Sequence, residues 1–361
     1  MIQKPLNKNE QLFQDLYHAI RNGEIPNGAR LATELELANR YGCSRITVRS
    51  SLRQLEELKL IRRVRGNGTY VNTEGIRFSS RRNIAVVASE VHAETTETDP
   101  YFSQLMMGLF RHGNMLDFSA NFIVLAEDEK NFIDSFERQS IDISDYDGLV
   151  FAKQLSAAEI AALEGQRRNF VALQPPAGEE EISYISIDNF NGAYMGARHL
   201  LERGRRDIVF LHGNLDERIN REKVDGFLAA LDEFGCVSPL RRRHYEMIPY
   251  QEESGAMVIR RLLEEDQKFD GLLIHGDWAT FGAVSVLREY GIRIPEDVAL
   301  VMYDDYIGVQ RMLKLAITAV RQPFTEQIRC ALQFLLRRLD CPDSPRTIQL
   351  IQPMLMIRET T

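Results

Sequence analysis

The chain has 361 residues, of which 44% are apolar and 27% are charged, and its formal net charge is −8. This length exceeds what one ordinary hydrophobic core supports, so we expect two or three folding units of globular type. The longest apolar runs, such as residues 84–88, are far shorter than the ~20 residues of a membrane span. The polar N-terminus also lacks the pattern of a signal peptide, which predicts a cytoplasmic protein with no membrane partner.

Charge is divided unevenly along the chain. Residues 1–83 contain 15 Lys and Arg against 8 Asp and Glu, a net charge of +7, whereas the other 278 residues have 29 against 44, a net charge of −15. A basic head indicates an anionic partner for the head alone, although a solvated charged surface would give the same balance. The scattered cysteines form no CxxC pair, so we expect free thiols and neither a metal site nor a cofactor; they are Cys43, Cys236, Cys330 and Cys341.

Three helices are predicted in the head. Apolar residues recur at helical spacing over 11–22, and a shorter helix over 34–41 follows Thr33, a suitable N-cap. A Gly-containing turn then leads to Ser44, which is placed to cap a third helix over 45–58. Two short helices joined in this way are typical of a helix-turn-helix, whose second helix enters the DNA major groove. That helix separates a core stripe (Val48, Leu52, Leu55, Leu58) from a basic face (Arg45, Arg49, Arg53).

Two short strands follow the third helix. Residues 60–64 and 69–71 flank the Gly-rich tip Arg65-Gly66-Asn67-Gly68, which predicts a β-hairpin of the kind called a wing. Glycines at the tip allow the backbone to approach a DNA groove, and the arginines of the hairpin supply positive charge. A row of arginines on a helix is often only a solvated face, but the turn, the helix and the basic hairpin occur together here.

Residues 8–72 resemble the winged helix of the GntR family. The resemblance rests on the run 31–38, on 41–49, and on the wing Arg65-Gly66-Asn67-Gly68-Thr69-Tyr70-Val71. It implies that Gly66 enters the minor groove and that Ser44, Arg45, Thr47 and Arg49 meet bases and phosphates. Leu35 stands where many members have Arg, and Ile46 where Thr is common, so the operator is expected to differ. When the other residues of the basic face and of the wing tip are included, the candidate DNA-binding residues are Ser44, Arg45, Thr47, Arg49, Arg53, Arg65, Gly66 and Asn67.

Beyond a short linker, residues 73–83, apolar strands alternate with amphipathic helices. This alternation predicts parallel sheets with helices on both faces, and 278 residues favour two such lobes over one large sheet. We expect lobe 1 at about 84–187 and 321–338, and lobe 2 at about 188–318 and 342–361. The candidate strands are 84–88, 121–125, 148–151, 170–173, 184–187, 207–211, 245–250, 271–275 and 298–302.

The body, residues 84–361, resembles the LacI/GalR effector domain, a two-lobed fold shared with periplasmic sugar-binding proteins. The strongest stretches are 187–208 and 291–305, supported by 220–227 and 318–323. A GntR-type head on such a body looks like the arrangement of arabinose-repressor-type regulators. The fold class is therefore α/β, with an N-terminal winged helix and a C-terminal periplasmic-binding-protein-like fold.

Ligands of open α/β sheets bind beyond the carboxyl ends of the strands, where Asp277 and Asp304 are placed. The LacI/GalR resemblance implies that Tyr101, Phe102, Lys223, Asp304 and Gln322 line the cleft, with Arg221, Tyr250 and Asp277 as further candidates. Lys223 replaces an Arg that is usual there and cannot give a planar bidentate contact. Each of these residues also has a purely structural interpretation; Asp188 and Asp277, for example, are both suited to helix capping.

The sequence thus predicts a ligand-responsive repressor of carbohydrate-utilisation genes. It is expected to bind a palindromic operator as a homodimer and to release it when a sugar-like effector closes the cleft. A nucleobase or a phosphorylated metabolite is the alternative effector. A sugar-processing enzyme with a DNA-binding appendage is a more distant alternative, suggested by Asp304-Asp305, His212 and His275. No nucleophile elbow, P-loop or HExxH motif supports catalysis, and adjacent residues of a strand point to opposite faces.

Overall fold

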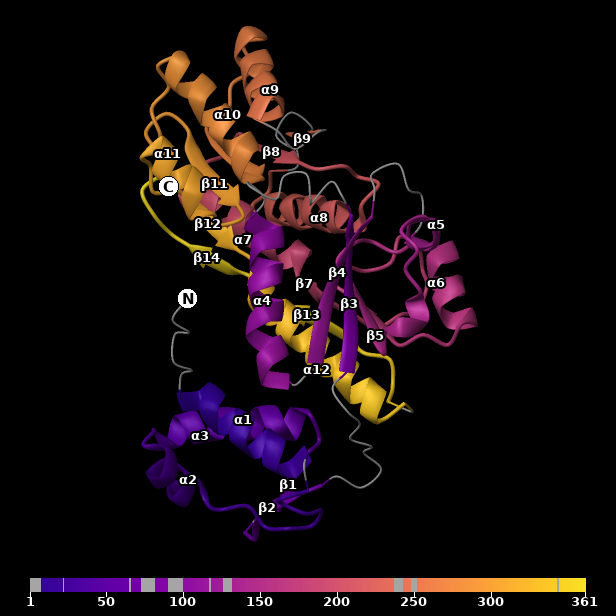
Figure 1. The fold of residues 1–361 in the computed structure, drawn as a ribbon. Helices are drawn as coiled ribbons and strands as arrows, with labels where there is room; N and C mark the ends of the chain where they lie inside the picture. The colour runs from indigo at the N-terminus through magenta and orange to yellow at the C-terminus, as the bar shows by residue number, and fades with distance from the viewer. Residues whose placement is uncertain are drawn as a thin grey trace.

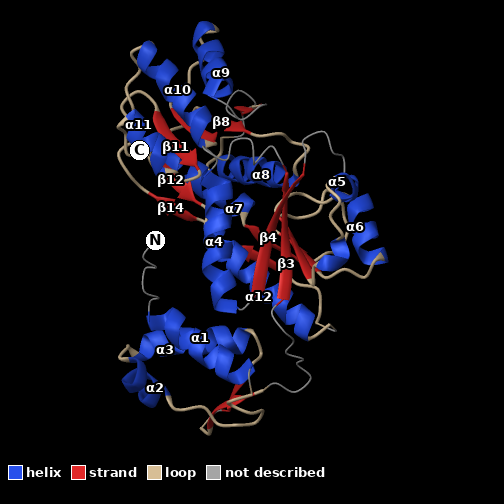
Figure 2. Ribbon diagram, in the orientation of Figure 1, coloured by secondary structure: helices blue, strands red, loops and turns tan. Residues whose placement is uncertain are grey.

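The computed structural model describes residues 8–21, 23–64, 66–72, 82–89, 100–116, 118–125, 132–236, 243–247, 252–342 and 344–361. Figure 1 shows a small N-terminal head below a larger body of two lobes, and Figure 2 shows that each lobe is a sheet covered by helices. No helix in these ranges combines the length and the apolar content that crossing a bilayer requires.

The head has the predicted order of elements: α1 (Lys8–Arg21), α2 (Glu34–Tyr41), α3 (Arg45–Glu57), β1 (Ile61–Val64) and β2 (Gly68–Val71). The hairpin is antiparallel, with Ile61 opposite Val71 and Val64 opposite Gly68. The predicted stripe of α3 is buried against α1 and α2, which confirms the assignment of its inward face.

The first lobe is a parallel six-stranded sheet in the order β13-β7-β6-β5-β3-β4. Alternate side chains of β3 enter different cores, because neighbouring residues of a strand point to opposite faces. Helices α4 (Pro100–Leu116) and α12 (Phe324–Asp340) cover one face, and α5 (Phe132–Arg138) and α6 (Ala157–Gly165) cover the other. The strands are β3 (Arg82–Ser89), β4 (Phe118–Leu125), β5 (Gly148–Phe151), β6 (Phe170–Ala172), β7 (Tyr184–Ile187) and β13 (Ile348–Ile351).

The second lobe is a six-stranded sheet in the order β14-β12-β11-β10-β8-β9, in which only β14 is antiparallel to its neighbour. Helices α7 (Asn189–Glu202) and α8 (Arg218–Glu233) cover one face; α9 (Glu252–Glu264), α10 (Asp277–Glu289) and α11 (Ile307–Leu313) cover the other. The strands are β8 (Ile208–His212), β9 (Arg243–Glu246), β10 (Gly271–His275), β11 (Ala299–Tyr303), β12 (Thr318–Arg321) and β14 (Met354–Met356).

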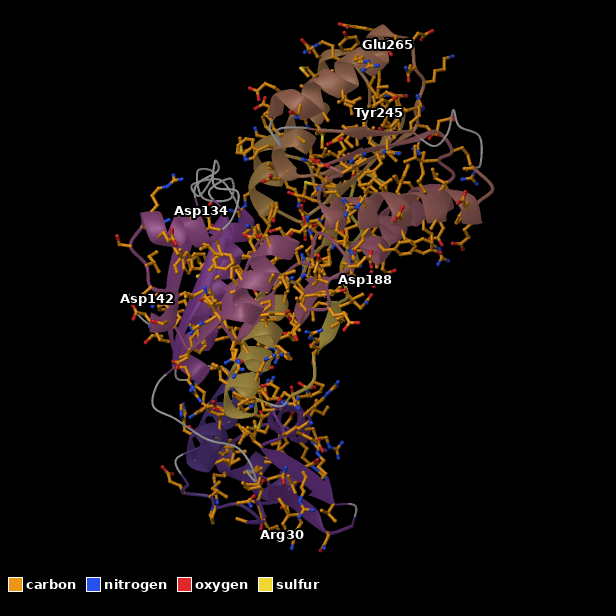
Figure 3. All side chains as sticks on the ribbon, turned by 90° about the vertical axis from the view of Figure 1, so that its right-hand side faces the viewer. Arg30, Asp134, Asp142, Asp188, Tyr245 and Glu265 are labelled. Atoms are coloured by element: carbon orange, nitrogen blue, oxygen red, sulfur yellow. The ribbon has the colours of Figure 1, made fainter. Side chains whose placement is uncertain are left out.

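The chain passes between the lobes three times: after β7, after β12 and after β13. Two of these crossings are joined, since Asp188 caps α7 by accepting the amide of Asn191 (2.9 Å) and also accepts the side-chain amide of Gln352 (2.9 Å). Asp188 lies at this crossing between the lobes (Figure 3). The capping interpretation of Asp188 is therefore confirmed.

Two expectations from the sequence are corrected. Residues 342–361 do not all belong to lobe 2, because β13 pairs with β7 in the first sheet and only β14 joins the second. Local pattern cannot tell which sheet an edge strand will join, and the crossing here takes only two residues, 352–353. The strand expected at 245–250 lies at Arg243–Glu246, and residues 248–250, including Tyr250, lie outside the described residues.

Helices α7 and α8 approach each other closely at Gly226. A Cβ at this position would lie 2.0 Å from the carbonyl oxygen of Phe190, so the backbones would have to move apart. We expect Gly226→Ala to lower the free energy of unfolding by about 1–3 kcal/mol, the usual cost of overpacking. Gly308→Ala is the matched control, because a Cβ at Gly308 in α11 meets nothing within 4 Å. Urea unfolding of both variants tests this, and equal stabilities would contradict the close contact.

Candidate functional site

The basic face of α3 is held by local capping. Thr33 and Glu36 form a reciprocal capping box at the start of α2, and Gly42, with φ 58°, ends that helix. Ser44 then caps α3 by accepting the amide of Thr47 (3.1 Å), and the two hydroxyls are 2.8 Å apart. These caps fix the angle at which α3 leaves the turn, and therefore the direction in which its arginines point.

The three arginines of α3 are exposed, with 58–79% of each side chain accessible. Sequence reasoning missed their acidic neighbour Glu34, which bonds Arg49 (2.8 Å) and lies 3.6 Å from Arg45. Arg53 pairs with Glu57 at 3.0 Å. An exposed ion pair of this kind contributes only about 0–1 kcal/mol to stability, so a DNA phosphate can replace the carboxylate as the partner of an arginine.

The wing tip is turned by glycines. Gly66 (φ 76°) and Gly68 (φ 120°) adopt backbone angles that favour glycine, and the Asn67 amide donates to Val64 (2.9 Å). Arg65 lies outside the described residues. A second basic group that sequence reasoning missed is Arg30, which bridges to β2 and whose side chain lies against Gly68. Figure 3 shows Arg30 at the end of the head that is farthest from the body.

Two apolar side chains interrupt this polar surface. Leu35 on α2 is 57% exposed, and Ile46 on α3 is 78% exposed. Both are the departures from the usual pattern noted in the sequence. An exposed apolar group at such a position suits the C5-methyl group of thymine better than a phosphate.

In lobe 2, four side chains gather at the carboxyl ends of the strands and the start of α8. We call Lys223, His275, Asp304 and Gln322 the polar cluster. Asp304 follows β11 with a φ of 96°, an unusual angle for a residue with a side chain, which costs about 1–3 kcal/mol. Its carboxylate accepts a hydrogen bond from Gln322, and His275 Nε2 lies 3.5 Å from its other oxygen. The structure thus brings together three of the predicted residues, Lys223, Asp304 and Gln322.

Lys223 is the charged centre of the polar cluster and is only 2% exposed. Its ammonium donates to His275 Nε2 (2.9 Å) and to Asn220 Oδ1 (3.4 Å), and it lies 4.8 Å from the centre of the Tyr303 ring. Burial lowers the pKa of Lys223 to about 8, although nearby Asp304 opposes this shift. Burial and the ammonium together hold the pKa of His275 well below its usual value, so His275 is neutral and its Nε2 accepts a hydrogen bond from Lys223.

A pair of histidines lies on the neighbouring strands β8 and β9. His212 Nε2 and His244 Nδ1 are 2.8 Å apart, and His212 Nδ1 is 2.7 Å from the carbonyl of Gly213. Burial lowers the pKa of both rings, so both are neutral at physiological pH. The sequence suggested His212 and His275 as catalytic groups and did not single out His244; the contacts of these rings are long-range, and no local motif reveals them.

The other predicted effector residues have different surroundings. The Arg221 guanidinium donates to the carbonyls of Leu215 (2.6 Å) and Asp216 (2.9 Å), which fastens the loop before α8. Asp277, in the first turn of α10, accepts the amide of Trp278 (2.9 Å). Tyr101, at the start of α4, packs edge-on against Phe324 at 4.8 Å. The Phe102 side chain and Tyr250 lie outside the described residues.

The Asp304-Asp305 pair, which follows the end of β11, is divided between two environments. Asp305 is bound by Arg321 (2.6 Å) and Arg358 (2.8 Å) and by Gln310 (2.8 Å). Burial alone would raise the pKa of Asp305, but the hydrogen bonds from Arg358 and Arg321 outweigh it and lower the pKa. Asp305 therefore fastens β12 and the C-terminal segment, while Asp304 belongs to the polar cluster.

One contact joins the lobes directly beside the polar cluster. Gln154, three residues beyond β5 in lobe 1, accepts the Arg218 amide (2.8 Å) and donates to the Asp216 carbonyl (3.4 Å) in lobe 2. The N-cap residue Glu217 makes no capping bond with its own side chain. Lobe 1 thus supplies the cap of α8, the helix that carries Lys223.

The lowered pKa of Lys223 gives stability a distinctive pH dependence. Between pH 8 and about 10.5 the unfolded chain binds this proton and the folded chain does not, so folding becomes more favourable as pH rises. Relative to Lys223→Met, the wild-type chain should gain up to about 3 kcal/mol of unfolding free energy over this range. Unfolding of both proteins by urea at each pH measures this, and a constant difference would show that Lys223 keeps its ordinary pKa.

Comparison with known protein families gives separate matches for the head and for the body. Residues 8–71 match the bacterial regulatory proteins of the gntR family, and residues 197–361 match the periplasmic binding protein-like domain. The HTH-type transcriptional regulator YvdE of Bacillus subtilis (strain 168) is 23% identical over 338 residues, which cover 92% of this chain and 100% of that protein.

Solved structures of similar fold are also regulators. The transcriptional regulator CelR in complex with cellobiose has a TM-score of 0.68 at 21% identity and covers 99% of this chain and 100% of its own. The lac repressor dimer bound to operator and the anti-inducer ONPF has a TM-score of 0.67 at 20% identity, covering 78% and 95%. The relatives are regulators rather than enzymes, which removes the catalytic alternative. The chain is a transcription regulator that joins a GntR-family winged-helix head to a periplasmic-binding-protein-like body.

Proposed function

We propose that this regulator is a homodimeric repressor of carbohydrate-utilisation genes that releases a palindromic operator when a sugar-like effector binds between its lobes. Residues 1–72 bind DNA, 73–83 link the two parts, and 84–361 bind the effector and the second subunit. A protein that acts on chromosomal DNA works in the cytoplasm. The observation that carries the effector assignment is the polar cluster at the carboxyl ends of the second sheet.

Operator recognition is assigned to α3 and the wing. The arginines of α3 supply phosphate or guanine contacts, and Leu35 and Ile46 supply apolar contacts to thymine. The proposed DNA-binding residues are Ser44, Arg45, Thr47, Arg49, Arg53, Arg65, Gly66 and Asn67, to which we add Arg30.

The charge balance of the polar cluster favours an uncharged effector. The one cation of the cluster, Lys223, is close enough to the Asp304 carboxylate for each to offset the other's charge, and His275 is neutral. A phosphorylated metabolite would need positive charge that is not already compensated. Hydroxyl groups, by contrast, both donate to a carboxylate and accept from an ammonium, and the neighbour CelR was solved with cellobiose. The proposed effector residues are Tyr101, Phe102, Arg221, Lys223, Tyr250, Asp277, Asp304 and Gln322.

Dimerisation is assigned to exposed apolar side chains on α4 and α11. Met106, Met107 and Phe110 project from α4, and Ile307 and Met312 from α11, all with substantial exposed area. Exposed apolar groups of this size mark interaction surfaces. A second copy of the chain is the proposed occupant, since the similar lac repressor was solved as a dimer on its operator.

The effector proposal predicts the outcome of a thermal-shift screen. Neutral mono- and disaccharides should raise the Tm, whereas sugar phosphates and nucleobases should not, because a ligand stabilises the state that binds it. Asp304→Asn should abolish the shift. The matched control is Asp297→Asn, at the opposite end of β11 and paired with Arg293. A shift with nucleobases or sugar phosphates alone would contradict the proposed effector class.

The operator proposal predicts opposite effects of two substitutions on α3 and α2. Arg45→Ala should weaken binding to a duplex selected from random sequence by about tenfold and reduce the salt slope by about 1. Glu34→Gln removes the carboxylate that competes with phosphates for Arg45 and Arg49, so it should strengthen binding. Fluorescence anisotropy over a salt series measures both. Unchanged affinity in Arg45→Ala would remove α3 from the DNA-binding surface.

A further inference from the structure

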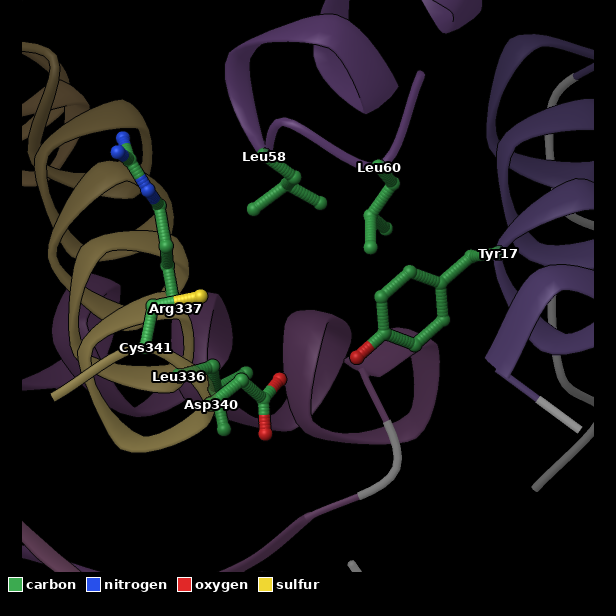
Figure 4. A pocket seen from close by; sticks show the side chains of 7 residues that line it. All are labelled: Tyr17, Leu58, Leu60, Leu336, Arg337, Asp340 and Cys341. Carbon is green, nitrogen blue, oxygen red and sulfur yellow. The ribbon is translucent and has the colours of Figure 1, made fainter. Parts of the chain in front are cut away.

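The head contacts the body at the last turn of α12. Tyr17 of α1 and Leu58 and Leu60, which follow α3, lie opposite that turn, and all three are buried. Figure 4 shows these side chains facing the end of α12 across a narrow space. We call this contact the seam; its body side is formed by Leu336, Arg337, Asp340 and Cys341.

The seam is apolar at its centre and incompletely filled. It contains a partly open pocket of about 20 Å³, which has room for about one water molecule and is too small for an effector. Leu336 belongs to the same continuous apolar cluster as Leu58 and Leu60, so burial holds the two parts together. An interface with few apolar anchors and a void is weaker than a domain core, which allows the head to dock and undock.

The other end of α12 lies at the polar cluster. Gln322, which bonds Asp304, is separated from the first residue of α12 only by Pro323. Phe324 packs against Tyr101, and Gln327 donates to the carbonyls of Leu173 (2.6 Å) and Ile185 (2.7 Å) in the first lobe. A helix of 17 residues spans about 25 Å, so α12 connects the polar cluster to the seam as one rigid element.

Two further contacts stiffen this connection. A Cβ at Gly108 of α4 would lie 2.3 Å from the side chain of Ile328, so α4 and α12 are in close contact. Arg82, at the start of β3, bonds Asp340 at 2.9 Å. This ion pair holds the first strand of the body against the seam end of α12. A shift at the start of α12 would therefore reach the seam rather than be absorbed along the helix.

We propose that the seam is the docking site of the winged helix on its own body, and that α12 transmits changes at the polar cluster to it. The second part rests on the proposed function, because it takes the polar cluster as the effector site. Docking sets where the head lies, and two docked heads in a dimer would have a fixed spacing. A change at the polar cluster would alter that spacing by loosening or tightening the seam.

Cys341 reports directly on docking in the full-length protein. Its thiol lines the seam and is half-buried, so its alkylation by a maleimide, followed by peptide mass spectrometry that separates it from Cys43, measures how often the seam opens. Leu58→Asp places a charge in the apolar centre and should accelerate the labelling of Cys341 by about tenfold or more. Leu35→Asp is the matched control, because Leu35 is exposed on the same head away from the seam, and it should leave the rate unchanged.

Two further variants keep the test decisive. Arg337→Glu perturbs the seam from the body side without entering the core of the head, so it should accelerate labelling even if Leu58→Asp impairs the folding of the head. Gln322→Ala perturbs α12 from the polar-cluster end, far from Cys341, and should also accelerate labelling. Equal rates in all variants would show that the seam does not dock the head. Faster labelling in Arg337→Glu with no change in Gln322→Ala would overturn the role of α12. Neither labelling rate requires a bound effector. A failed thermal-shift screen would therefore reject the proposed function without changing how the labelling results are interpreted.

Discussion

A buried ammonium group is the constraint around which the sensing half of this regulator is organised. Lys223 is removed from water, and its charge is tolerated because Asp304, His275 and Asn220 surround it. These partners come from different strands and from α8, so the second sheet and its helix must meet in one arrangement for the charge to be stabilised. An effector that enters here must take over hydrogen bonds that the protein already makes, and this favours a ligand rich in both donors and acceptors.

The two ends of the molecule are connected through the crossings between the lobes. Asp188 and Gln352 join two crossings, and the third leads through Gln322 into α12. Gln154 adds a direct bond from lobe 1 to the start of α8. Any movement of one lobe against the other must change these contacts, and α12 carries such a change toward the head. At the head, Glu34 lies beside Arg45 and Arg49, so that the DNA contacts proposed for these arginines would exchange one anionic partner for another.

Much of this fold could be predicted from the sequence. Helix α2 has its predicted bounds because Thr33 and Gly42 cap it, and the buried parallel strands are recognisable as short apolar runs. The assignment of β13 could not be predicted, since pairing with β7 is a long-range choice. For the same reason the sequence identified Lys223 and Asp304 but did not reveal that His275 lies beside them. It also did not reveal that Glu34 lies beside Arg49. Arg221 bonds loop carbonyls, an orientation that its place in a motif does not reveal.

If the winged helix and the polar cluster are coupled sites, operator binding and effector binding must influence each other reciprocally. The dissociation constant of a sugar found in the thermal-shift screen would be measured with and without saturating operator duplex, and that of the operator with and without saturating sugar. Thermodynamic linkage requires both constants to change by the same factor. Each ligand is expected to weaken the binding of the other by this common factor. A sugar that binds equally well to the free and the operator-bound protein would contradict it.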